Sequence, residues 1–486
     1  MEAFSQWKTS SYALNSHRIR EHIEDLCTRD DDSLTADYRT RSYYRSGGNF
    51  LWIDRHGIDH RADTLLAVLH TIRDLGFSER KFHLYQIERD IQRVRHIDFL
   101  NADSSHSINV TMARLEYNLT KDYLRFVSGE RYGYMNPRYV FNRIDVMGLD
   151  SVGNPTGYRQ LFDVPIHRPS RHYYMYALHK VYVDSVSDYL KEVQTHDPLY
   201  AMLKSALKHH PSAEQRKRIL VNMERCRWRG YVPQKHDKYI VVNIPAYHLY
   251  AYDNDQLWET RVGCGAIATK TPLLTSQIER MDVNPSWVIP MSIIKKDIAR
   301  HAGSTYYFTS HRYDIREAAT GLHVNPARVT AEMLRSGSYR VVQEGGKGNS
   351  LGRIIFRFKN NFSVFLHDTS NPNFFTNDDR GVSHGCVRVQ NPIGFAFWLL
   401  GKNADEWTQD KLRISMDIPP QTTQGQEYIT NPEADRKIIN SLPVTPRVPI
   451  YITYFTLYPT RSGRLIPFAD VYGYDEVIYQ QLQQLY

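Results

Sequence analysis

The spacing of apolar residues predicts a mainly helical first half. Apolar side chains recur every three or four residues, as on one face of an amphipathic helix. This pattern covers residues 64–91, 110–127, 173–190 and 197–210, and a fifth stretch that begins near Ala213. Asp197-Pro198 begins the fourth stretch, since aspartate caps a helix N-terminus and proline fits the first turn. His210-Pro211 ends it, because proline does not continue a helix. Up to about Gly230 we therefore expect helices, with loops over 136–171.

The pattern changes at Lys238. From there, short apolar runs separated by polar turns predict strands at 240–244, 249–252, 257–262, 353–358 and 362–366. Residues 291–345 interrupt this region with a mixed, largely helical segment, and an insertion of that kind is typical of a lid. Two further strands are expected at 449–457 and 465–471.

These patterns predict an α+β fold in three parts. Residues 1–235 form a mainly helical scaffold domain. Residues 236–418 form a mainly-β, sandwich-like domain that carries the helical lid insertion 291–345. Residues 419–486 form a C-terminal extension that packs on the β domain. A chain of 486 residues is long enough for this organisation, since one domain usually takes 100–200 residues.

Composition narrows the class of protein. Apolar residues make up 41% of the chain and charged residues 23%, which excludes a mainly disordered chain. No apolar run approaches the roughly 18 residues that a membrane-spanning helix needs. The net charge of +8 is small for this length and is spread along the chain, so we expect no nucleic-acid partner. The 34 tyrosines fit half-buried packing or, alternatively, an extended amphipathic groove.

Cysteine usage and the N-terminus bear on the compartment. The chain has four cysteines, which are Cys27, Cys226, Cys264 and Cys386. Four are too few for a disulfide scaffold in a chain of this length. No two of them have the CxxC spacing that would indicate a zinc site. The first twenty residues lack the apolar core of a signal peptide. Either the protein is cytosolic or an export signal has been trimmed, and these residues leave both alternatives open.

One group of residues stands out chemically. His367-Asp368 ends a predicted strand. Fifteen residues separate His367 from the hexapeptide Ser383–Arg388, which is Ser-His-Gly-Cys-Val-Arg. A thiol is a poor nucleophile until it ionises, so a catalytic cysteine needs an imidazole or backbone dipoles that lower its pKa. His367 is placed to act on Cys386, and N–H groups at the glycine turn can hold an oxyanion. A helix that begins at Asn391-Pro392 would add its positive end.

Two other interpretations of this group remain open. Cys386 could be an inert buried thiol, since free cysteine is among the most buried residue types. His367, His384 and Cys386 could instead bind zinc, because imidazole and thiolate are common zinc ligands. With 21 histidines in the chain, some cluster by chance.

The segment His367–Arg388 resembles the active-site pattern of the YkuD-type L,D-transpeptidases. The similarity extends to the long, YcbB-like branch of that family, strongly over about 236–480 and more weakly over about 40–230. The matching segments are 242–247, 270–272, 283–290, 349–353, 366–369, 454–456 and 470–475. One departure is the short stretch from Leu207 to Arg216, which leaves no room for the peptidoglycan-binding module that longer members carry there.

The resemblance implies a cysteine acyltransferase of the bacterial cell wall. Cys386 would attack the peptide bond between the third residue and the terminal D-Ala of a tetrapeptide stem and form a thioester. The amine of a second stem would resolve that thioester and give a 3→3 cross-link. His367 would be the general base, oriented by the backbone carbonyl of Asp368. The N–H groups of Gly385 and Cys386 would form the oxyanion hole, with His384 shaping it.

The resemblance also implies residues that contact substrate. Arg388 either anchors a substrate carboxylate or braces the turn. Ser383 and Trp287 are the other candidates for substrate binding, although Trp287 also fits a purely structural role. We expect no cofactor and no metal ion.

Alternative functions separate by their chemistry. An L,D-carboxypeptidase would use the same residues but resolve the thioester with water, because acceptor choice depends on how well the site excludes water. A non-catalytic wall-binding protein would not need both His367 and Cys386. The resemblance implies stem peptides of peptidoglycan as partners, carbapenems as covalent inhibitors and a periplasmic location.

Overall fold

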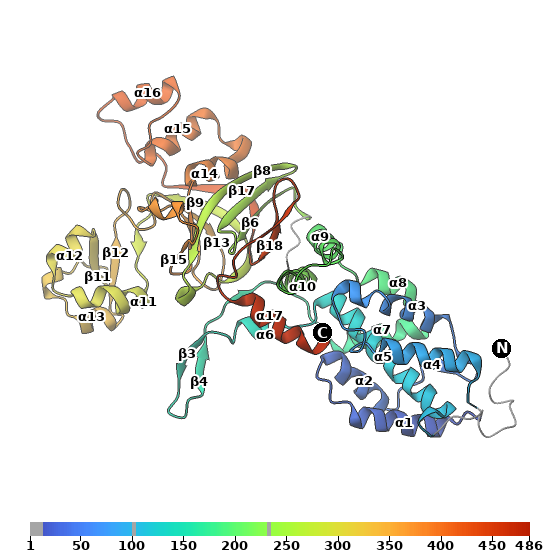
Figure 1. Cartoon of the computed structure of the whole chain (residues 1–486). Helices are drawn as coiled ribbons and strands as arrows, with labels where there is room; N and C mark the ends of the chain where they lie inside the picture. The colour runs from blue at the N-terminus through green and yellow to red at the C-terminus, as the bar shows by residue number, and fades with distance from the viewer. Residues whose placement is uncertain (1–12, 100–103, 231–234) are drawn as a thin grey trace. The chain divides into compact units, whose positions relative to one another are not determined.

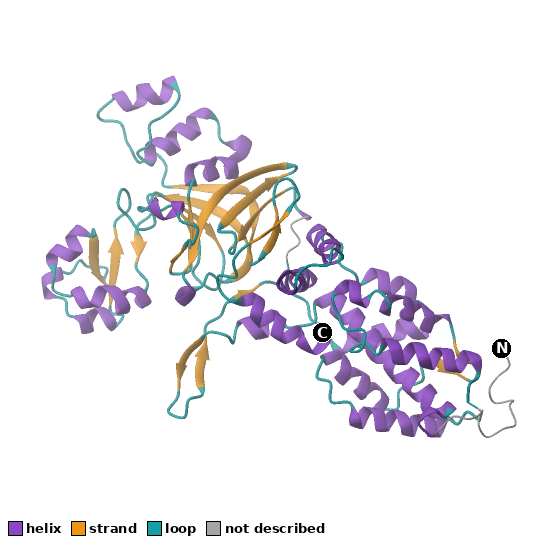
Figure 2. Ribbon diagram, viewed as in Figure 1, coloured by secondary structure: helices purple, strands orange, loops and turns teal. Residues whose placement is uncertain are grey.

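The computed structural model describes residues 13–99, 104–230 and 235–486, and these form two compact units (Figure 1). The helical unit comprises 13–140, 165–230 and 455–486 within the described residues, and the β unit comprises 141–164 and 235–454. The predicted α+β class is confirmed, with a helical scaffold region followed by a mostly-β region (Figure 2).

The helical unit is built around one long helix, α5, whose side chains are buried on nearly every face. Other helices surround it because their apolar stripes need a partner surface. The helices are α1 (Ser16–Arg29), α2 (Thr35–Arg45), α3 (His60–Leu69), α4 (Leu84–His96), α5 (Ile108–Tyr132), α6 (Pro137–Phe141), α7 (Arg171–Tyr182), α8 (Val186–Glu192), α9 (Pro198–Leu207), α10 (Ala213–Arg227) and α17 (Tyr474–Leu482). Short strand pairs are β1 (Ile53–Asp54) with β2 (Gly57–Ile58), and β18 (Leu457–Pro459) with β19 (Leu465–Pro467). Since α9 ends at Leu207 and α10 begins at Ala213, the predicted lack of room for a module between them is confirmed.

Buried ionic groups on α5 are paired. Glu130 accepts a hydrogen bond of 2.9 Å from Arg227 Nε and one of 3.0 Å from the Tyr200 hydroxyl, and all three residues are almost inaccessible to solvent. Glu116 accepts hydrogen bonds from the backbone N–H groups of 51–53. Burying a charge is costly unless it is paired, so each of these carboxylates depends on its partners.

The β unit contains one sheet that closes on itself. Its strands follow the order β13-β14-β16-β8-β7-β6-β17-β9, and β9 also pairs with β13. Their bounds are β6 (Lys238–Asn243), β7 (His248–Asp253), β8 (Gln256–Gly265), β9 (Leu273–Val283), β13 (Ile354–Phe358), β14 (Leu366–His367), β16 (Val387–Val389) and β17 (Ser441–Thr453). Strand β5 (Phe162–Asp163) pairs with β9, and β15 (Gly381–Ser383) pairs with β8. Because the sheet closes, few of its strands have an unpaired edge. The sequence predicted a sandwich-like domain and did not predict this closure.

Two segments depart from the predicted domain boundaries. Strand β17 lies between β6 and β9 in the sheet, so 419–454 is an integral part of the β unit rather than an added extension. Residues 455–486 belong to the helical unit, where Arg225 forms an ion pair of 2.7 Å with Asp475 and Asn222 hydrogen-bonds Thr456. The prediction that this last part packs on the β domain is therefore corrected. Residues 141–164, assigned to the scaffold domain from sequence, belong to the β unit.

The predicted lid insertion forms a small body with its own core. It contains a three-stranded sheet in the order β10-β12-β11, so it is less helical than the mixed, largely helical segment that was predicted. The strands are β10 (Trp287–Val288), β11 (Tyr313–Glu317) and β12 (Tyr339–Gln343), and the helices include α11 (Met291–Ile293), α12 (Thr305–Ser310) and α13 (Ala331–Arg335). Phe308, Leu334 and Val341 are fully buried in this core. Helices α14 (Pro392–Leu400), α15 (Glu406–Ser415) and α16 (Thr423–Thr430) follow the last active-site strand in the chain. A hairpin of β3 (Val146–Leu149) and β4 (Pro155–Tyr158) completes the described elements of the β unit.

The buried pair of Glu130 and Arg227 gives a stability prediction. Glu130→Ala leaves the Arg227 guanidinium buried with a lost partner, so we expect the free energy of unfolding to fall by about 3–5 kcal/mol. Urea denaturation followed by circular dichroism measures this change. The matched control is Glu214→Ala, which removes the exposed partner of Arg218 and should change stability by less than about 1 kcal/mol. Equal effects of the two variants would contradict the assignment.

Candidate active site

The pairing of two short parallel strands brings the motif residues together. In β14 and β16, Leu366 pairs with Val387 and His367 with Arg388. The Val387 N–H donates to the carbonyl oxygen of Phe365, which extends this register toward Cys386. Side chains alternate along a strand, so His367, Arg388 and Cys386 lie on one face of the sheet while Leu366 and Val387 are buried on the other.

The turn that carries Cys386 is held by hydrogen bonds. Gly385 has φ of 119°, a conformation that L side chains rarely adopt, which explains the glycine before the nucleophile. The Gly385 N–H donates to Ser383 Oγ (3.0 Å), and the Ser383 hydroxyl donates to the carbonyl of Cys386 (2.5 Å). Ser383 is 3% exposed. The Ser383 hydroxyl braces the turn, and its predicted role in binding substrate stays a prediction. The Gly385 N–H is bonded within the turn in this structure, and its predicted part in the oxyanion hole also stays a prediction.

Two threonines of a distant loop fasten the same turn. The Thr271 hydroxyl accepts from the Gly265 N–H and donates to the carbonyl of Gly385, each at 2.8 Å, and Thr271 is fully buried. The Thr269 hydroxyl donates to the carbonyl of Ser383 at 2.8 Å. The sequence predicted no role for Thr269 or Thr271, and residues 270–272 contributed only to the family resemblance. Their hydroxyls fix the backbone on which Cys386 sits.

His367 is buried and uncharged at neutral pH. Burial, together with the nearby charge of Arg388, lowers the pKa of its imidazole to about 4, although the backbone carbonyls of Asp368 and Leu351 act in the opposite direction. Nδ1 has no well-formed hydrogen bond among the described residues. The Asp368 carbonyl acts on the imidazole, and its orienting role stays a prediction. A neutral imidazole can accept a proton, as a general base must.

Cys386 is partly exposed, and its thiol is neutral. Burial of much of its surroundings raises its pKa to about 11, although the Phe365 backbone and Arg388 oppose this shift. The expected low thiol pKa is thus wrong for this state. The predicted helix begins at Pro392 as expected, but β16 separates its first turn from Cys386, so its dipole does not act directly on the sulfur. Thiol and imidazole are both neutral, and the proton must move as the sulfur attacks.

Arg388 places a positive charge on the active face without using it in the fold. Its guanidinium lies over the Phe374 ring, 5.5 Å from the centroid, and its Nε has no hydrogen-bond partner among the described residues. Gly263 pairs with Arg388 across β8, and a Cβ at Gly263 would lie 2.6 Å from the Phe374 ring, so the glycine makes room for that ring. Of the two predicted roles, bracing the turn finds no contact to support it. A buried, unpaired guanidinium donor instead favours an external anion.

The Asp368 carboxylate supports a neighbouring loop. Its Oδ2 accepts from the Arg353 N–H at 2.8 Å, and its burial raises its pKa. Gly352 has φ of 67°, and a Cβ there would lie 2.4 Å from the Asp368 side chain, so only glycine fits. The side chain of Asp368 is therefore structural, whereas its backbone carbonyl lies near His367.

The remaining predicted residues are Trp287, which lies in the insertion, and His384, which lies in the turn itself. Trp287 is in β10, pairs with Gln343 and packs against the core of the insertion, which agrees with its structural alternative. His384 is exposed and makes no hydrogen bond with another described residue. Across the described part of the chain, no three His, Cys, Asp or Glu side chains are grouped to hold a metal ion, so the zinc alternative gains no support.

Comparison with known proteins agrees with this geometry. Residues 237–411 match the model of the YkuD L,D-transpeptidase catalytic domain. This stretch of the chain is therefore similar to the catalytic domain of the YkuD L,D-transpeptidases. Residues 38–207 match the scaffold domain that was expected from sequence. A Haemophilus influenzae protein named "Putative L,D-transpeptidase" is 31% identical over 264 residues, which is 54% of this chain and 48% of that protein. The chain thus spans about half the length of that curated relative. None of the described helices is both long and apolar enough to cross a membrane.

The pKa shifts predict how Cys386 reacts with pH. Because its pKa is near 11, the thiolate fraction is small at pH 7 and rises about tenfold per pH unit. Alkylation of Cys386 by iodoacetamide, followed by peptide mass mapping, should therefore accelerate about tenfold from pH 7 to pH 8 and again to pH 9. The buried cysteines Cys27, Cys226 and Cys264 should react far more slowly in the folded protein. A rate that stays flat from pH 7 to pH 9 would mean that a thiolate already exists.

Thr271 tests the hydrogen-bonded turn. Thr271→Val keeps the shape but removes the hydroxyl that joins Gly265 to Gly385, so we expect acylation of Cys386 by a carbapenem to slow by about 10- to 100-fold. Thr271→Ser keeps the hydroxyl and should react within about threefold of the wild type. Intact-protein mass spectrometry against time gives both rates. If Thr271→Val reacts as fast as Thr271→Ser, the bridge does not position the nucleophile.

Proposed function

We propose that this protein is a peptidoglycan L,D-transpeptidase that forms 3→3 cross-links through a thioester on Cys386. The observation that carries the proposal is the shared face of His367, Cys386 and Arg388, set by the register of β14 and β16 within a YkuD-family domain. This arrangement supplies a nucleophile, a base and an anion-binding group next to one another.

In the proposed first step, Cys386 Sγ attacks the carbonyl of the third stem residue while its proton moves to the imidazole of His367. Because the thiol pKa is raised and that of His367 is lowered, this transfer coincides with attack rather than preceding it. The oxyanion is assigned to the Cys386 N–H, since the Gly385 N–H is bonded to Ser383. His367 then returns the proton to the departing amine of D-Ala, and the thioester remains.

In the second step, the side-chain amine of another stem attacks the thioester. His367 accepts a proton from that amine, and the Cys386 sulfur leaves and takes a proton back. The product is an amide between two third-position residues, and the enzyme is regenerated. Arg388 is suited to bind a carboxylate of the stem, since its guanidinium Nε has no hydrogen-bond partner among the described residues.

The cellular setting follows from this chemistry. The substrate lies outside the cytoplasm, so we propose a periplasmic location after removal of an export signal. Carbapenems are proposed as covalent inhibitors because their strained acyl group can be attacked by the same thiol. The proposal requires no metal ion or organic cofactor, because the cysteine supplies the nucleophile and His367 moves the protons.

The test uses a disaccharide-tetrapeptide with intact-mass and product analysis. Wild type should form an acyl-enzyme, release D-Ala and give a dimer whose mass equals two stems less one D-Ala. Cys386→Ala should do none of these. Cys264→Ala is the matched control, since Cys264 is buried with a pKa raised to about 12, and it should retain activity. A tripeptide product without dimer would identify the carboxypeptidase. Absence of acyl-enzyme on wild type would overturn the proposal.

A further inference from the structure

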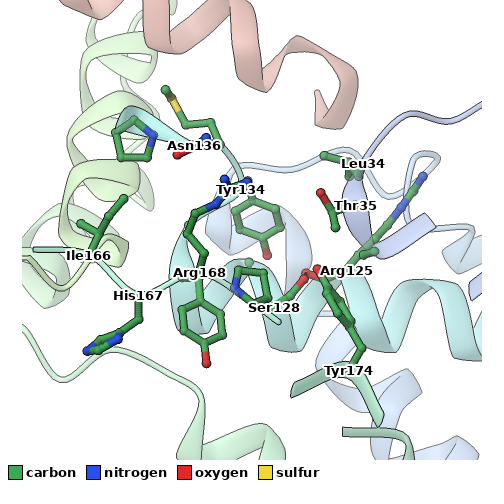
Figure 3. Close-up of a pocket in the computed structure, with 17 residues that line it drawn as sticks. Leu34, Thr35, Arg125, Ser128, Tyr134, Asn136, Ile166, His167, Arg168 and Tyr174 are labelled. Carbon is green, nitrogen blue, oxygen red and sulfur yellow. The ribbon is translucent and has the colours of Figure 1, made fainter. Parts of the chain in front are cut away.

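The helical unit holds a cavity that the proposed chemistry does not use. It lies where the end of α5 and the loop before α6 meet the start of α2 and the segment before α7, and it measures about 90 Å³ (Figure 3). One water molecule needs roughly 10–15 Å³ on this scale, so the cavity has room for several waters or for a small organic group. Thr35 and Tyr174 lie on one side of it, and Asn136 and Ile166 on the other (Figure 3).

Among the described residues, those that line this cavity include two arginines and a histidine and no carboxylate. Arg125 is on its wall but is already bonded to Asp32 and Asp37, so its charge is balanced. Arg168 also lines the cavity, is exposed, and forms no ion pair with a described residue. An anionic group at this end would therefore meet an available guanidinium, which suits a carboxylate.

A second observation concerns Asn136. Its Oδ1 is buried and has no hydrogen-bond partner among the described residues. An asparagine directly before a helix usually accepts from the first N–H groups of that helix, yet here the oxygen makes no such bond. Leaving a buried acceptor unsatisfied is unfavourable. A ligand with an N–H donor would satisfy it.

The rest of the lining is apolar or aromatic. Tyr132 is half-buried on the wall, and Pro137 and Pro169 flank the loops that form the rim. Such surfaces suit a small alkyl group or the face of a sugar ring. The cavity thus combines an acceptor that needs an N–H, an unpaired guanidinium and an apolar wall.

We propose that this cavity binds a small N-acylated group that carries a free carboxylate. The amide N–H of the ligand donates to Asn136 Oδ1, its carboxylate pairs with Arg168, and its alkyl or ring portion lies against Tyr132. Resting on the proposed function, the ligand belongs to the wall polymer, where two sources share this chemistry: the N-acyl-D-alanine end of a stem and an N-acetylmuramic acid unit with a free carboxylate. The scaffold would thereby contribute substrate recognition separate from Cys386.

The experiment titrates the full chain with four probes and follows binding by calorimetry. N-acetyl-D-alanine and N-acetylmuramic acid carry both the amide and the carboxylate. N-acetylglucosamine lacks the carboxylate, and acetate lacks the amide. At least one of the first two should bind, and the last two should bind at least tenfold more weakly. Binding of N-acetyl-D-alanine alone assigns the stem as the source, and binding of N-acetylmuramic acid alone assigns the glycan.

Variants locate the binding. Arg168→Gln should weaken it at least tenfold, and Asn136→Leu should do the same. Arg171→Gln removes an exposed cation of the same region that does not line the cavity, and it should bind as wild type does. Circular dichroism confirms that each variant is folded.

The outcomes separate this inference from the proposed function. If neither N-acylated carboxylate binds, or if Arg168→Gln binds as tightly as Arg171→Gln, the inference is overturned. Acylation of Cys386 by a carbapenem in the same preparation would show that the catalytic proposal survives that failure. Conversely, binding that depends on Arg168, in a protein whose Cys386 forms no acyl-enzyme, would uphold the cavity as a site and reject the transpeptidase.

Discussion

The register between β14 and β16 is the constraint on which the candidate site depends. It pairs His367 with Arg388 and aligns Cys386 with the residue two positions before His367. A slip of one residue would turn one set of side chains to the opposite face of the sheet and separate the thiol from the imidazole. The register is secured because Leu366 and Val387 are completely buried on the other face and could not move to solvent without losing their packing.

Backbone support then fixes the nucleophile. The turn before β16 is bonded internally through Ser383 and externally through Thr269 and Thr271. Because these groups are largely buried, breaking one bond would leave a polar atom unsatisfied, and the turn is therefore held in one conformation. Burial also keeps Cys386 and His367 neutral, which ties proton transfer to the moment of attack.

Local sequence patterns predicted much of this arrangement. The change of apolar period near Lys238 marked the boundary between helices and strands, and the segment from His367 to Cys386 marked the candidate site. Other features depend on contacts between distant residues. No local pattern of charge or hydrophobicity indicates that β9 pairs with β13 and closes the sheet. Nor does a local pattern indicate that residues 455–486 belong to the helical unit.

The site shows the same limit at the level of single atoms. Sequence indicated that Ser383 and Gly385 belong to the motif, but not that the Ser383 hydroxyl occupies the Gly385 N–H. Nor could it indicate that Thr271, more than a hundred residues earlier, bonds to the Gly385 carbonyl. The thiol pKa was also misjudged, because burial is a property of the folded site and outweighs the nearby positive groups.

The central claim is that attack begins from a neutral imidazole beside a neutral thiol. The most direct measurement is the titration of the His367 ring nitrogens by nitrogen-15 NMR in the resting enzyme, with His367→Gln used to assign the signal. The account predicts that the ring stays neutral down to about pH 5 and titrates near pH 4. A ring that is protonated at pH 7, together with a thiolate on Cys386, would contradict it.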